Sequence, residues 1–397
     1  MATDNKNKVL NVPPLRFPEF TEEWKAEQLD NIATLSKGIG ISKEQLSEDG
    51  EPCILYGELY TKYKSEIIKQ VESKTDINGS KLKRSKANDV IIPCSGETAV
   101  DIATARCVPF DNILFGGDLN VISLHQYDGA FMSYQLNGKR KYDIARVAQG
   151  VSIVHLYGEH LKAIKTYNPT LPEQQKIAKL LSLLDDRIDT QNKIIEDLKK
   201  LKSAIIEIEY SPKDSYHSHI GGAIVQISKR NKDNHLCNVL SVSNRQGFIK
   251  QSEQFEDRNV ASDDTSNYKI VEKNDFAYNP ARINVGSIAR LTKFETGIVS
   301  PMYICFRTKD CLLPEYLELF FESRNFFYHI QKRLEGSVRL CLSYEELCNI
   351  PIVIPSIEKQ KQVDLHLSKL AQKIDLEMKI LQFVQQQKTY LLHQMFI

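Results

Sequence analysis

Basic side chains are the residues of this sequence whose chemistry is easiest to interpret. Lysines neutralise phosphates, and an arginine can hold guanine O6 and N7 with two hydrogen bonds. Clusters at 81–86 and 139–141, together with single arginines in polar stretches such as Asn-Pro-Ala-Arg-Ile-Asn-Val-Gly (279–286), therefore predict a DNA-binding surface. The candidate DNA contacts are Lys37, Lys81, Lys83, Arg84, Lys86, Arg106, Lys139, Arg140, Lys141, Arg245, Arg282, Arg290 and Arg339. For any one cluster, the alternative is an ordinary solvated face.

Motifs of catalysis and metal binding are missing from the sequence. It has neither a GxxxxGK[ST] phosphate loop nor a GxGxxG dinucleotide motif. Asn-Pro-Ala at 279–281 and Asn-Val-Pro-Pro at 11–14 do not reproduce the Asn-Pro-Pro-aromatic run of adenine methyltransferases. His217 and His219 form an isolated His-x-His motif in a polar stretch, without the further ligands that a metal site needs. We therefore expect no catalytic residues, no metal and no cofactor bound by this chain.

Length and composition restrict the class of protein. The chain has 397 residues, 42% of them hydrophobic and 26% charged, which is typical of a globular protein of about two to three domains. Its 52 basic and 51 acidic residues give a net charge of +1, so a DNA-binding surface must be a local patch. No run approaches the ~20 apolar residues of a membrane span. The eight cysteines contain no CxxC pair and are typical of reduced thiols, so we expect a cytoplasmic protein.

The two halves of the sequence repeat each other. Adding 186 to a position in the first half often leads to a matching residue in the second: Asn88-Asp89 meets Asn274-Asp275, and the segment 171–189 meets 357–375. Further upstream, Ala105-Arg106 meets Ala289-Arg290 at an offset of 184, as expected when loops differ in length. The sequence therefore predicts two versions of one structural unit.

Each copy ends in a long stretch without Gly or Pro, covering residues 173–211 and 356–397. Thr170-Leu-Pro-Glu173 fits a capping box at the first helix start, and Ser356 is the matching cap in the second copy. Apolar residues recur at steps of three and four, which predicts helices with a heptad seam that continues to Ile205 and Ile208. The seam residues are Ile177, Leu181, Leu184, Ile188, Ile195, Leu198, Val363, Leu367, Leu370, Ile374, Leu381 and Val384.

Polar residues interrupt the two seams at matching positions. Gln191 and Lys202 interrupt the first seam, and Glu377 and Lys388 interrupt the second. Matched polar positions fix the register of paired helices, so we expect the two helices to pair antiparallel as a coiled coil. The alternative is that each helix packs only on its own domain.

Short runs rich in β-branched and aromatic residues fill the segments before the two helices, with Gly, Asn and Asp between them. Examples are 90–94, 119–124 and 302–306. The expected fold class is α+β: two similar globular domains with twisted sheets, related by an internal pseudo-two-fold repeat and separated by the two long helices.

The sequence resembles the specificity subunits of type I restriction–modification systems over nearly its whole length. The resemblance rests on a glycine-containing segment followed by Pro-x-x-x-Glu-Gln and a long helix, seen at 149–189 and in a degenerate form at 335–367. The strings at 37–46, 55–63 and 89–98 are similar to one group of the family's target recognition domains. The second copy has Lys359-Gln-Lys where the pattern has Glu-Gln-Gln.

The resemblance implies a non-catalytic chain that carries DNA specificity for a larger complex. Target recognition domains at 1–170 and 211–357 would each read one half of a bipartite, asymmetric site on double-stranded DNA. Helices at 171–210 and 358–397 would set the gap and contact two methyltransferase subunits, with restriction subunits joining the full complex. S-adenosylmethionine, ATP and Mg would then bind to the partner subunits. No membrane is involved.

Two other functions remain open from the residues alone. One is a standalone DNA methyltransferase, which the missing cofactor motifs disfavour. The other is a coiled-coil DNA-binding regulator without an enzyme partner, which co-purification with a methyltransferase subunit would exclude.

Overall fold

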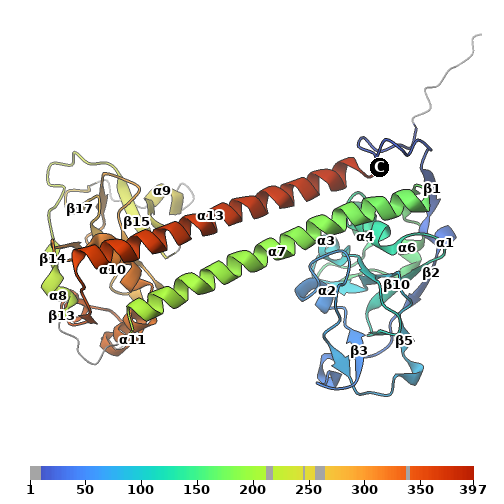
Figure 1. The fold of residues 1–397 in the computed structure, drawn as a ribbon, viewed down its shortest axis with the longest axis horizontal. Coiled ribbons are helices and arrows are strands. Elements are labelled where there is room, and N and C mark those ends of the chain that lie inside the picture. The colour runs from blue at the N-terminus through green and yellow to red at the C-terminus, as the bar shows by residue number, and fades with distance from the viewer. Residues whose placement is uncertain (1–9, 212–217, 245, 255–263, 337–339) are drawn as a thin grey trace, which may run out of the picture. The chain divides into compact units, whose positions relative to one another are not determined.

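The computed structural model describes residues 10–211, 218–244, 246–254, 264–336 and 340–397 (Figure 1). The chain divides into two compact units. Unit 1 contains the described residues up to Lys193 together with Lys379–Ile397, and unit 2 contains Ile194–Met378. Unit 1 is therefore built from two separate stretches of chain.

Two four-stranded sheets form the body of unit 1. The first has the order β2-β10-β6-β8 and is antiparallel throughout. The second has the order β4-β3-β9-β5 and contains one parallel pair, β3 with β9. Strand β1 pairs with β12, and β7 pairs with β11. The strands are β1 (Lys25–Gln28), β2 (Ala33–Lys37), β3 (Glu51–Ile54), β4 (Lys74–Thr75), β5 (Lys83–Arg84), β6 (Asp89–Pro93), β7 (Ser95–Gly96), β8 (Arg106–Val108), β9 (Leu114–Phe115), β10 (Leu119–Leu124), β11 (Val154–His155) and β12 (Lys165–Asn168).

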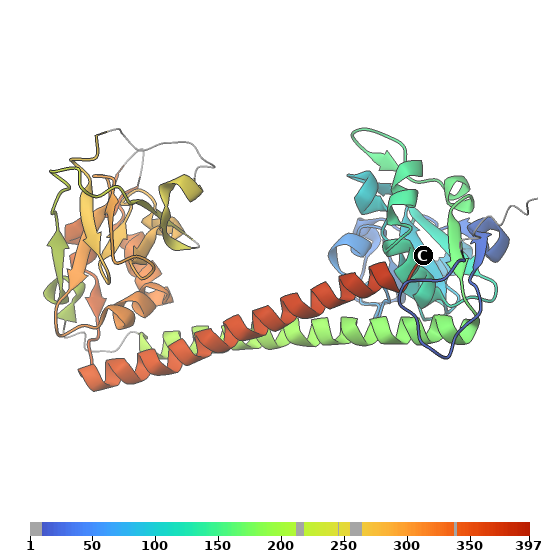
Figure 2. The ribbon, with the colours of Figure 1, turned by 90° about the horizontal axis from the view of Figure 1, so that it is seen from above.

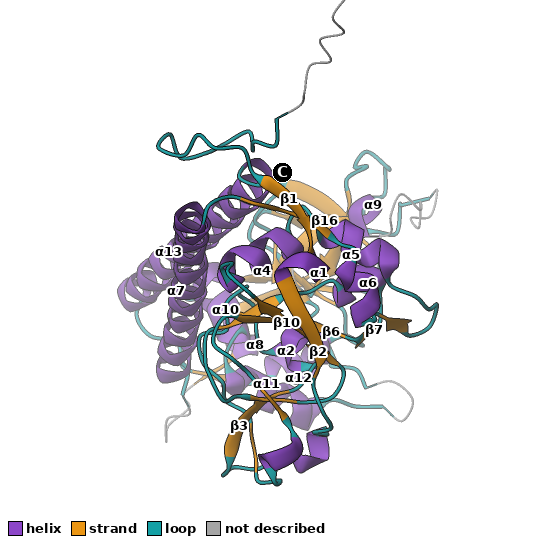
Figure 3. Cartoon of the chain, turned by 90° about the vertical axis from the view of Figure 1, so that its right-hand side faces the viewer, coloured by secondary structure: helices purple, strands orange, loops and turns teal. Residues whose placement is uncertain are grey.

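Short helices cover the first sheet, and apolar side chains of β6, β10 and α4 fill the core beneath them. They are α1 (Leu29–Ile32), α2 (Glu58–Thr61), α3 (Ala99–Ile102), α4 (Gly129–Asn137), α5 (Lys141–Val147) and α6 (Gly158–Lys162), with 3-10 turns at Lys43–Gln45 and Gly79–Lys81. The long helix α7 (Leu171–Glu209) follows β12 directly. In Figure 3, α7 lies on one side of unit 1 and β7 on the other.

Unit 2 repeats this sheet topology. Its antiparallel sheet has the order β14-β21-β18-β19, its second sheet has the order β16-β15-β20-β17 with β15 and β20 parallel, and β13 pairs with β22. The same strand order with the parallel pair at the same place confirms the predicted internal repeat and the α+β class. The strands are β13 (Ser218–His219), β14 (Ile224–Ile227), β15 (Val239–Ser243), β16 (Gly247–Lys250), β17 (Lys269–Glu272), β18 (Phe276–Tyr278), β19 (Ile288–Arg290), β20 (Thr296–Val299), β21 (Ile304–Thr308) and β22 (Pro351–Ile352).

The helices of unit 2 pack on β14, β18 and β21 around an aromatic core, except α9, which packs on β15 and β16. They are α8 (Ile220–Ala223), α9 (Gln251–Gln254), α10 (Pro314–Phe321), α11 (Arg324–Arg333), α12 (Tyr344–Cys348) and the long α13 (Ile357–Gln394), with a 3-10 turn at Ile283–Val285.

One buried glutamine fixes the start of each long helix. The Gln174 side chain accepts a hydrogen bond from the backbone N of Asp128 at 2.9 Å and donates to a carbonyl just before α7. Gln360 does the same for α13, accepting from the backbone N of Leu313 at 2.8 Å. Asp128 and Leu313 are the residues that precede α4 and α10, so the glutamine shared by the two copies locks each long helix to its domain.

In unit 1, the first half of α7 and the last half of α13 lie side by side and antiparallel (Figure 1, Figure 2). Ile177 and Leu181 of α7 share a core with Met395 and Phe396, together with Trp24. In this core, the Trp24 ring lies edge-on to Phe396. The alternative that each helix packs only on its own domain is therefore wrong, since the end of α13 completes the core of unit 1.

In unit 2, the same two helices pair at their other ends. Ile206 of α7 lies in one core with Val363 and Leu367 of α13, and Lys359 lies 3.5 Å from the carboxylate of Glu209. This pairing is antiparallel as well.

Burial along the seam follows the heptad pattern up to its last turn. Seven of the twelve seam residues are buried and the other five are half-buried; these five are Leu184, Ile188, Leu198, Leu370 and Leu381. Ile208, the predicted end of the first seam, is 74% exposed, whereas Ile206 is buried. A straight helix of 3.6 residues per turn drifts away from a 3.5-residue repeat, and this drift explains the change of face.

The two predicted helix caps have different outcomes. Ser356 caps α13, because its hydroxyl accepts a hydrogen bond from the backbone N of Lys359 at 3.3 Å. The capping box expected from Thr170 and Glu173 is replaced by other contacts of Glu173, whose carboxylate binds Arg16 and Trp24.

Candidate nucleic-acid interface

The basic cluster at 81–86 lies on and around β5 of unit 1. Lys81 and Lys86 are exposed and Lys83 is half-buried, and none of the three has a side-chain partner among the described residues. Arg84 instead forms a two-point contact with Glu51, with N–O distances of 2.6 and 3.0 Å, and this contact raises the pKa of Arg84. The lysines are therefore available for phosphates, whereas the arginine is already paired.

Arg106, another predicted DNA contact, is buried. Its guanidinium donates to the carbonyl of Tyr63 at 2.9 Å and to the carbonyl of Ala105 at 2.8 Å. Burial lowers its pKa. This geometry argues against a DNA contact, because the donors that would bind a base are used by backbone carbonyls inside the domain.

The cluster at 139–141 is mostly structural. Arg140 donates to the backbone oxygen of Ile397 at 2.9 Å, lies 3.0 Å from Asp143 and stacks over the Tyr167 ring. Lys141 is half-buried, and burial, followed by the charge of Arg106, lowers its pKa. Lys139 is half-buried, without a side-chain partner among the described residues. The exposed Lys37, at the end of β2, lies over the Tyr157 ring at 5.6 Å.

In unit 2, the predicted arginines also divide into available and paired ones. Arg290 is held by Glu315 and by Glu318, the latter at 2.9 Å, so it joins β19 to α10. Arg282 is exposed, and within the described parts of the chain its side chain forms no hydrogen bond or ion pair. Arg245 and Arg339 lie outside the described residues.

The backbone around Arg282 is fixed. Its carbonyl accepts hydrogen bonds from the backbone N of Val285 at 3.2 Å and of Ser287 at 3.1 Å. Gly286 has φ +89°, a conformation that glycine adopts without strain. The exposed guanidinium is therefore presented by a rigid turn directly after β18, as a base-reading side chain requires.

Unit 1 has a different set of side chains at the corresponding place, directly after β6. Strand β7 and the segment 149–155 border an open concavity of about 690 Å³. The predicted contact Arg106, although buried, borders it. Glu97, Asp101, Tyr56 and Ile153 line it as well. Reasoning from the sequence missed these residues, although the segment 149–153 belongs to the repeat and is its most exposed apolar part.

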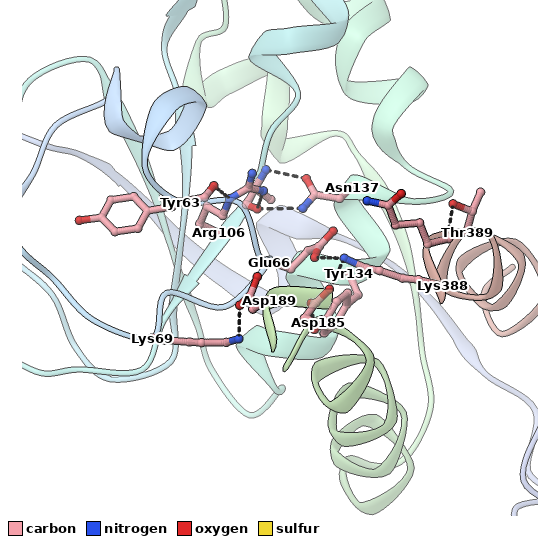
Figure 4. A network of polar contacts seen from close by, with 12 residues as sticks. Tyr63, Glu66, Lys69, Arg106, Tyr134, Asn137, Asp185, Asp189, Lys388 and Thr389 are labelled. Carbon is pink, nitrogen blue, oxygen red and sulfur yellow. Dashed lines mark hydrogen bonds and ion pairs between the residues drawn. The ribbon is translucent and has the colours of Figure 1, made fainter. Parts of the chain in front are cut away.

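A buried ionic network joins α13 to the domain of unit 1 (Figure 4). The Lys388 ammonium lies 2.6 Å from the carboxylates of Glu66 and Asp185, and the Tyr134 hydroxyl donates to Asp185 at 2.6 Å. Burial, followed by the charge of Glu66, raises the pKa of Asp185. Burial alone would lower the pKa of Lys388, but the two carboxylates outweigh it and raise that pKa. The polar interruption at Lys388 therefore attaches the helix to its domain.

The opposite faces of the long helices carry exposed apolar side chains. Phe383 is 70% exposed and Tyr390 60% exposed on α13, and Leu183 is 51% exposed on α7. All three lie within unit 1. They are candidate contacts for a partner protein.

Residues 21–200 match the family model described as the type I restriction modification DNA specificity domain. The match covers 180 of the 397 residues of the chain. The matched residues comprise most of the globular part of unit 1 and most of α7. Within the part of the chain that the structure describes, no helix is long and apolar enough to cross a membrane.

The chain is also similar to a protein and to solved structures that are described as parts of type I restriction–modification systems. The type I restriction enzyme MjaVIII specificity subunit of Methanocaldococcus jannaschii is 27% identical over 202 residues, which are 49% of this chain and 42% of that protein. The match thus spans less than half of the length of this relative. The crystal structure of a type I restriction-modification system S subunit from M. genitalium has a TM-score of 0.60 at 17% identity, covering 97% of this chain and 99% of that chain. A structure from a study of complex assembly and conformational transition of the type I R-M system has a TM-score of 0.55 at 13% identity, covering 96% and 98%. The two structures support the fold.

Proposed function

We propose that this chain is the DNA-recognition subunit of a type I restriction–modification complex and reads a bipartite, asymmetric target on double-stranded DNA. The observation that carries the proposal is the repeat itself: two units with the same strand order present different side chains at the same place. Unit 1 presents Glu97 and Ile153 there, and unit 2 presents Arg282. Different side chains read different base edges, so the two half-sites differ.

In this proposal, the chain is non-catalytic and acts through partner subunits. Two methyltransferase subunits dock on the exposed apolar faces of the long helices, and restriction subunits join the full complex. S-adenosylmethionine, ATP and Mg bind to those partners. The helices also set the gap between the half-sites; α7 is unbroken over its 39 residues, so it can serve as a rigid spacer.

The test is a domain exchange. The chain is expressed with its methyltransferase partner, and the target is read by sequencing the methylated bases of the host genome. Replacing residues 1–165 with an unrelated recognition domain is expected to change one half of the target and leave the other. A change in both halves, or methyl transfer by the pure chain without a partner, would contradict the proposal.

Docking is tested separately with Phe383→Asp and the matched control Val225→Asp, which changes an exposed residue of β14. The first variant is expected to co-purify with less methyltransferase, and the second is not. Equal recovery of the partner with both variants would remove the apolar face of α13 from the proposal.

A further inference from the structure

Most arginines of unit 1 already contact other groups of the chain. Five of the six already bond to groups of the chain: Arg16, Arg84, Arg106, Arg140 and Arg146. The sixth, Arg187, lies on α7. Arg16, Arg106 and Arg140 are held inside the unit, whereas the ion pairs of Arg84 and Arg146 are accessible to solvent. Few arginine donors therefore remain in unit 1 for guanine, the most frequent base contact of arginine.

A rigid loop of unit 1 presents apolar side chains to solvent. The backbones of Gln149 and His155 exchange two hydrogen bonds, of 2.9 and 2.7 Å, which close the loop. Gly150 has φ +123°, and a Cβ at this position would lie 2.1 Å from the Ile153 carbonyl oxygen, so only glycine fits. Val151 at the tip is 98% exposed, and Ile153 is 60% exposed. The loop thus presents two aliphatic side chains to solvent.

Unit 2 has the same loop closure. Glu335 and Cys341 exchange the equivalent pair of backbone hydrogen bonds, and Gly336 has φ +121°. Because two units with different sequences repeat this glycine conformation and this pair of hydrogen bonds, the loop closure is part of the fold that the two units share. The side chains at its tip are what differs between the copies.

An unpaired carboxylate lies on the same concavity. Glu97 is exposed and has no side-chain partner among the described residues, whereas its neighbour Asp101 accepts a hydrogen bond from the Thr98 hydroxyl at 2.6 Å. Glu97 follows β7 directly, and the Tyr60 hydroxyl anchors that strand by donating a hydrogen bond to the Ser95 carbonyl at 3.0 Å. Phosphates repel a carboxylate, so a carboxylate on a DNA-binding surface is expected to contact a base rather than the backbone. In the major groove it accepts a hydrogen bond from cytosine N4.

We propose that unit 1 reads its half-site with this concavity and the loop that borders it: Val151 at the loop tip and Ile153 contact thymine 5-methyl groups, and Glu97 accepts a hydrogen bond from cytosine N4. This inference rests on the proposed function, and it names the base chemistry of one half-site. It also places that chemistry on the side of unit 1 away from α7, where β7 lies (Figure 3). The long helices thus leave the reading surface uncovered.

The experiment uses the complex of the chain with its methyltransferase partner and a duplex of the target found by methylated-base sequencing. Each thymine of the unit 1 half-site is replaced in turn by deoxyuridine, which removes only the methyl group. For the wild type, one replacement is expected to weaken binding about fourfold, the value for one buried methyl group. For Val151→Ala, the same replacement is expected to have no effect, whereas the control Val225→Ala behaves as the wild type.

Glu97→Gln is tested with duplexes that carry each base at the half-site positions. Its preference for cytosine at one position is expected to fall at least about fivefold, the lower end of one good base contact. Glu48→Gln, an exposed carboxylate elsewhere in unit 1, is the matched control. Both Glu97→Gln and Val151→Ala change exposed side chains, so their melting temperatures are expected to match the wild type.

The outcomes separate this inference from the proposed function. If the complex selects a bipartite target but both variants keep the wild-type base preferences, the inference is wrong and the proposed function stands. The inference is also wrong if deoxyuridine still weakens binding of Val151→Ala. A uniform loss of affinity for all sequences also overturns it. Failure of the wild-type complex to select any bipartite target overturns the proposed function itself.

Discussion

Removing the Lys388 ammonium isolates two carboxylates inside unit 1. In Lys388→Met, the side chains of Glu66 and Asp185, which are 10% and 5% exposed, lose the ammonium that forms an ion pair with both of them. Deleting one partner of a buried ion pair typically costs about 3–5 kcal/mol. With a urea dependence of about 2–3 kcal/mol/M, the unfolding midpoint of unit 1 is expected to fall by about 1–2 M.

The assay can follow unit 1 by itself. Trp24 is the only tryptophan of the chain; it is 1% exposed and lies in the core that contains Phe396. Its fluorescence during urea unfolding therefore reports on the core that α13 completes. Lys200→Met, which removes an exposed lysine paired along α7 with Glu196, is the matched control and is expected to leave the midpoint unchanged.

The effect depends on pH in a defined direction. Burial raises the pKa of Asp185 in the folded chain, and loss of the ammonium raises it further. A carboxyl with a higher pKa in the folded state takes up a proton on folding, so stability increases as the pH falls from 7 toward 5. The difference between Lys388→Met and wild type is therefore expected to shrink at pH 5, and Asp185→Asn in the same chain is expected to recover part of the loss. An unchanged midpoint at pH 7, or a loss of equal size at both pH values, would refute the reasoning.

Three further predictions concern DNA binding. Insertion of seven residues in register into both long helices adds ~10 Å, so the gap in the target is expected to grow by about three base pairs at 3.4 Å each; an unchanged gap in the methylated sequences would exclude the spacer role. Lys81, Lys83 and Lys86 are expected to contact phosphates, so their replacement by glutamine should reduce the slope of log K against log salt concentration by about 0.9 for each lost contact. The preferred sequence is expected to stay the same; an altered base preference would show that these lysines touch bases. Arg282→Ala is expected to reduce the discrimination between bases at one position of the unit 2 half-site by about 1–3 kcal/mol, measured in binding assays with substituted duplexes. An effect on the other half-site would contradict the proposal that each unit reads its own half-site.

The repeat and the long helices could be predicted because their signals are local and periodic. Matching segments at a constant offset gave the duplication, and the spacing of residues such as Ile177 and Leu181 gave the helix seam. The same reasoning placed Ile208 in the seam, where the drift between 3.5 and 3.6 residues per turn turns it to solvent.

The available basic residues could not be separated from the structural ones, because their partners are distant in sequence. Arg106 binds the carbonyl of Tyr63, and Arg140 binds that of Ile397. Glu173 looked like part of a local cap but binds Arg16, 157 residues earlier. Composition shows that these charges exist, and only tertiary structure decides which of them face solvent.

The return of α13 into unit 1 determines the order in which the chain can fold during synthesis. Met395 and Phe396 belong to the core around Trp24, yet the ribosome adds them after the whole of unit 2. Unit 2 is continuous in sequence, from Ile194 to Met378, so it has all of its residues first. Unit 1 is translated first but is the last to acquire a complete core, and until α13 is added the apolar side chains around Trp24 stay exposed to chaperones.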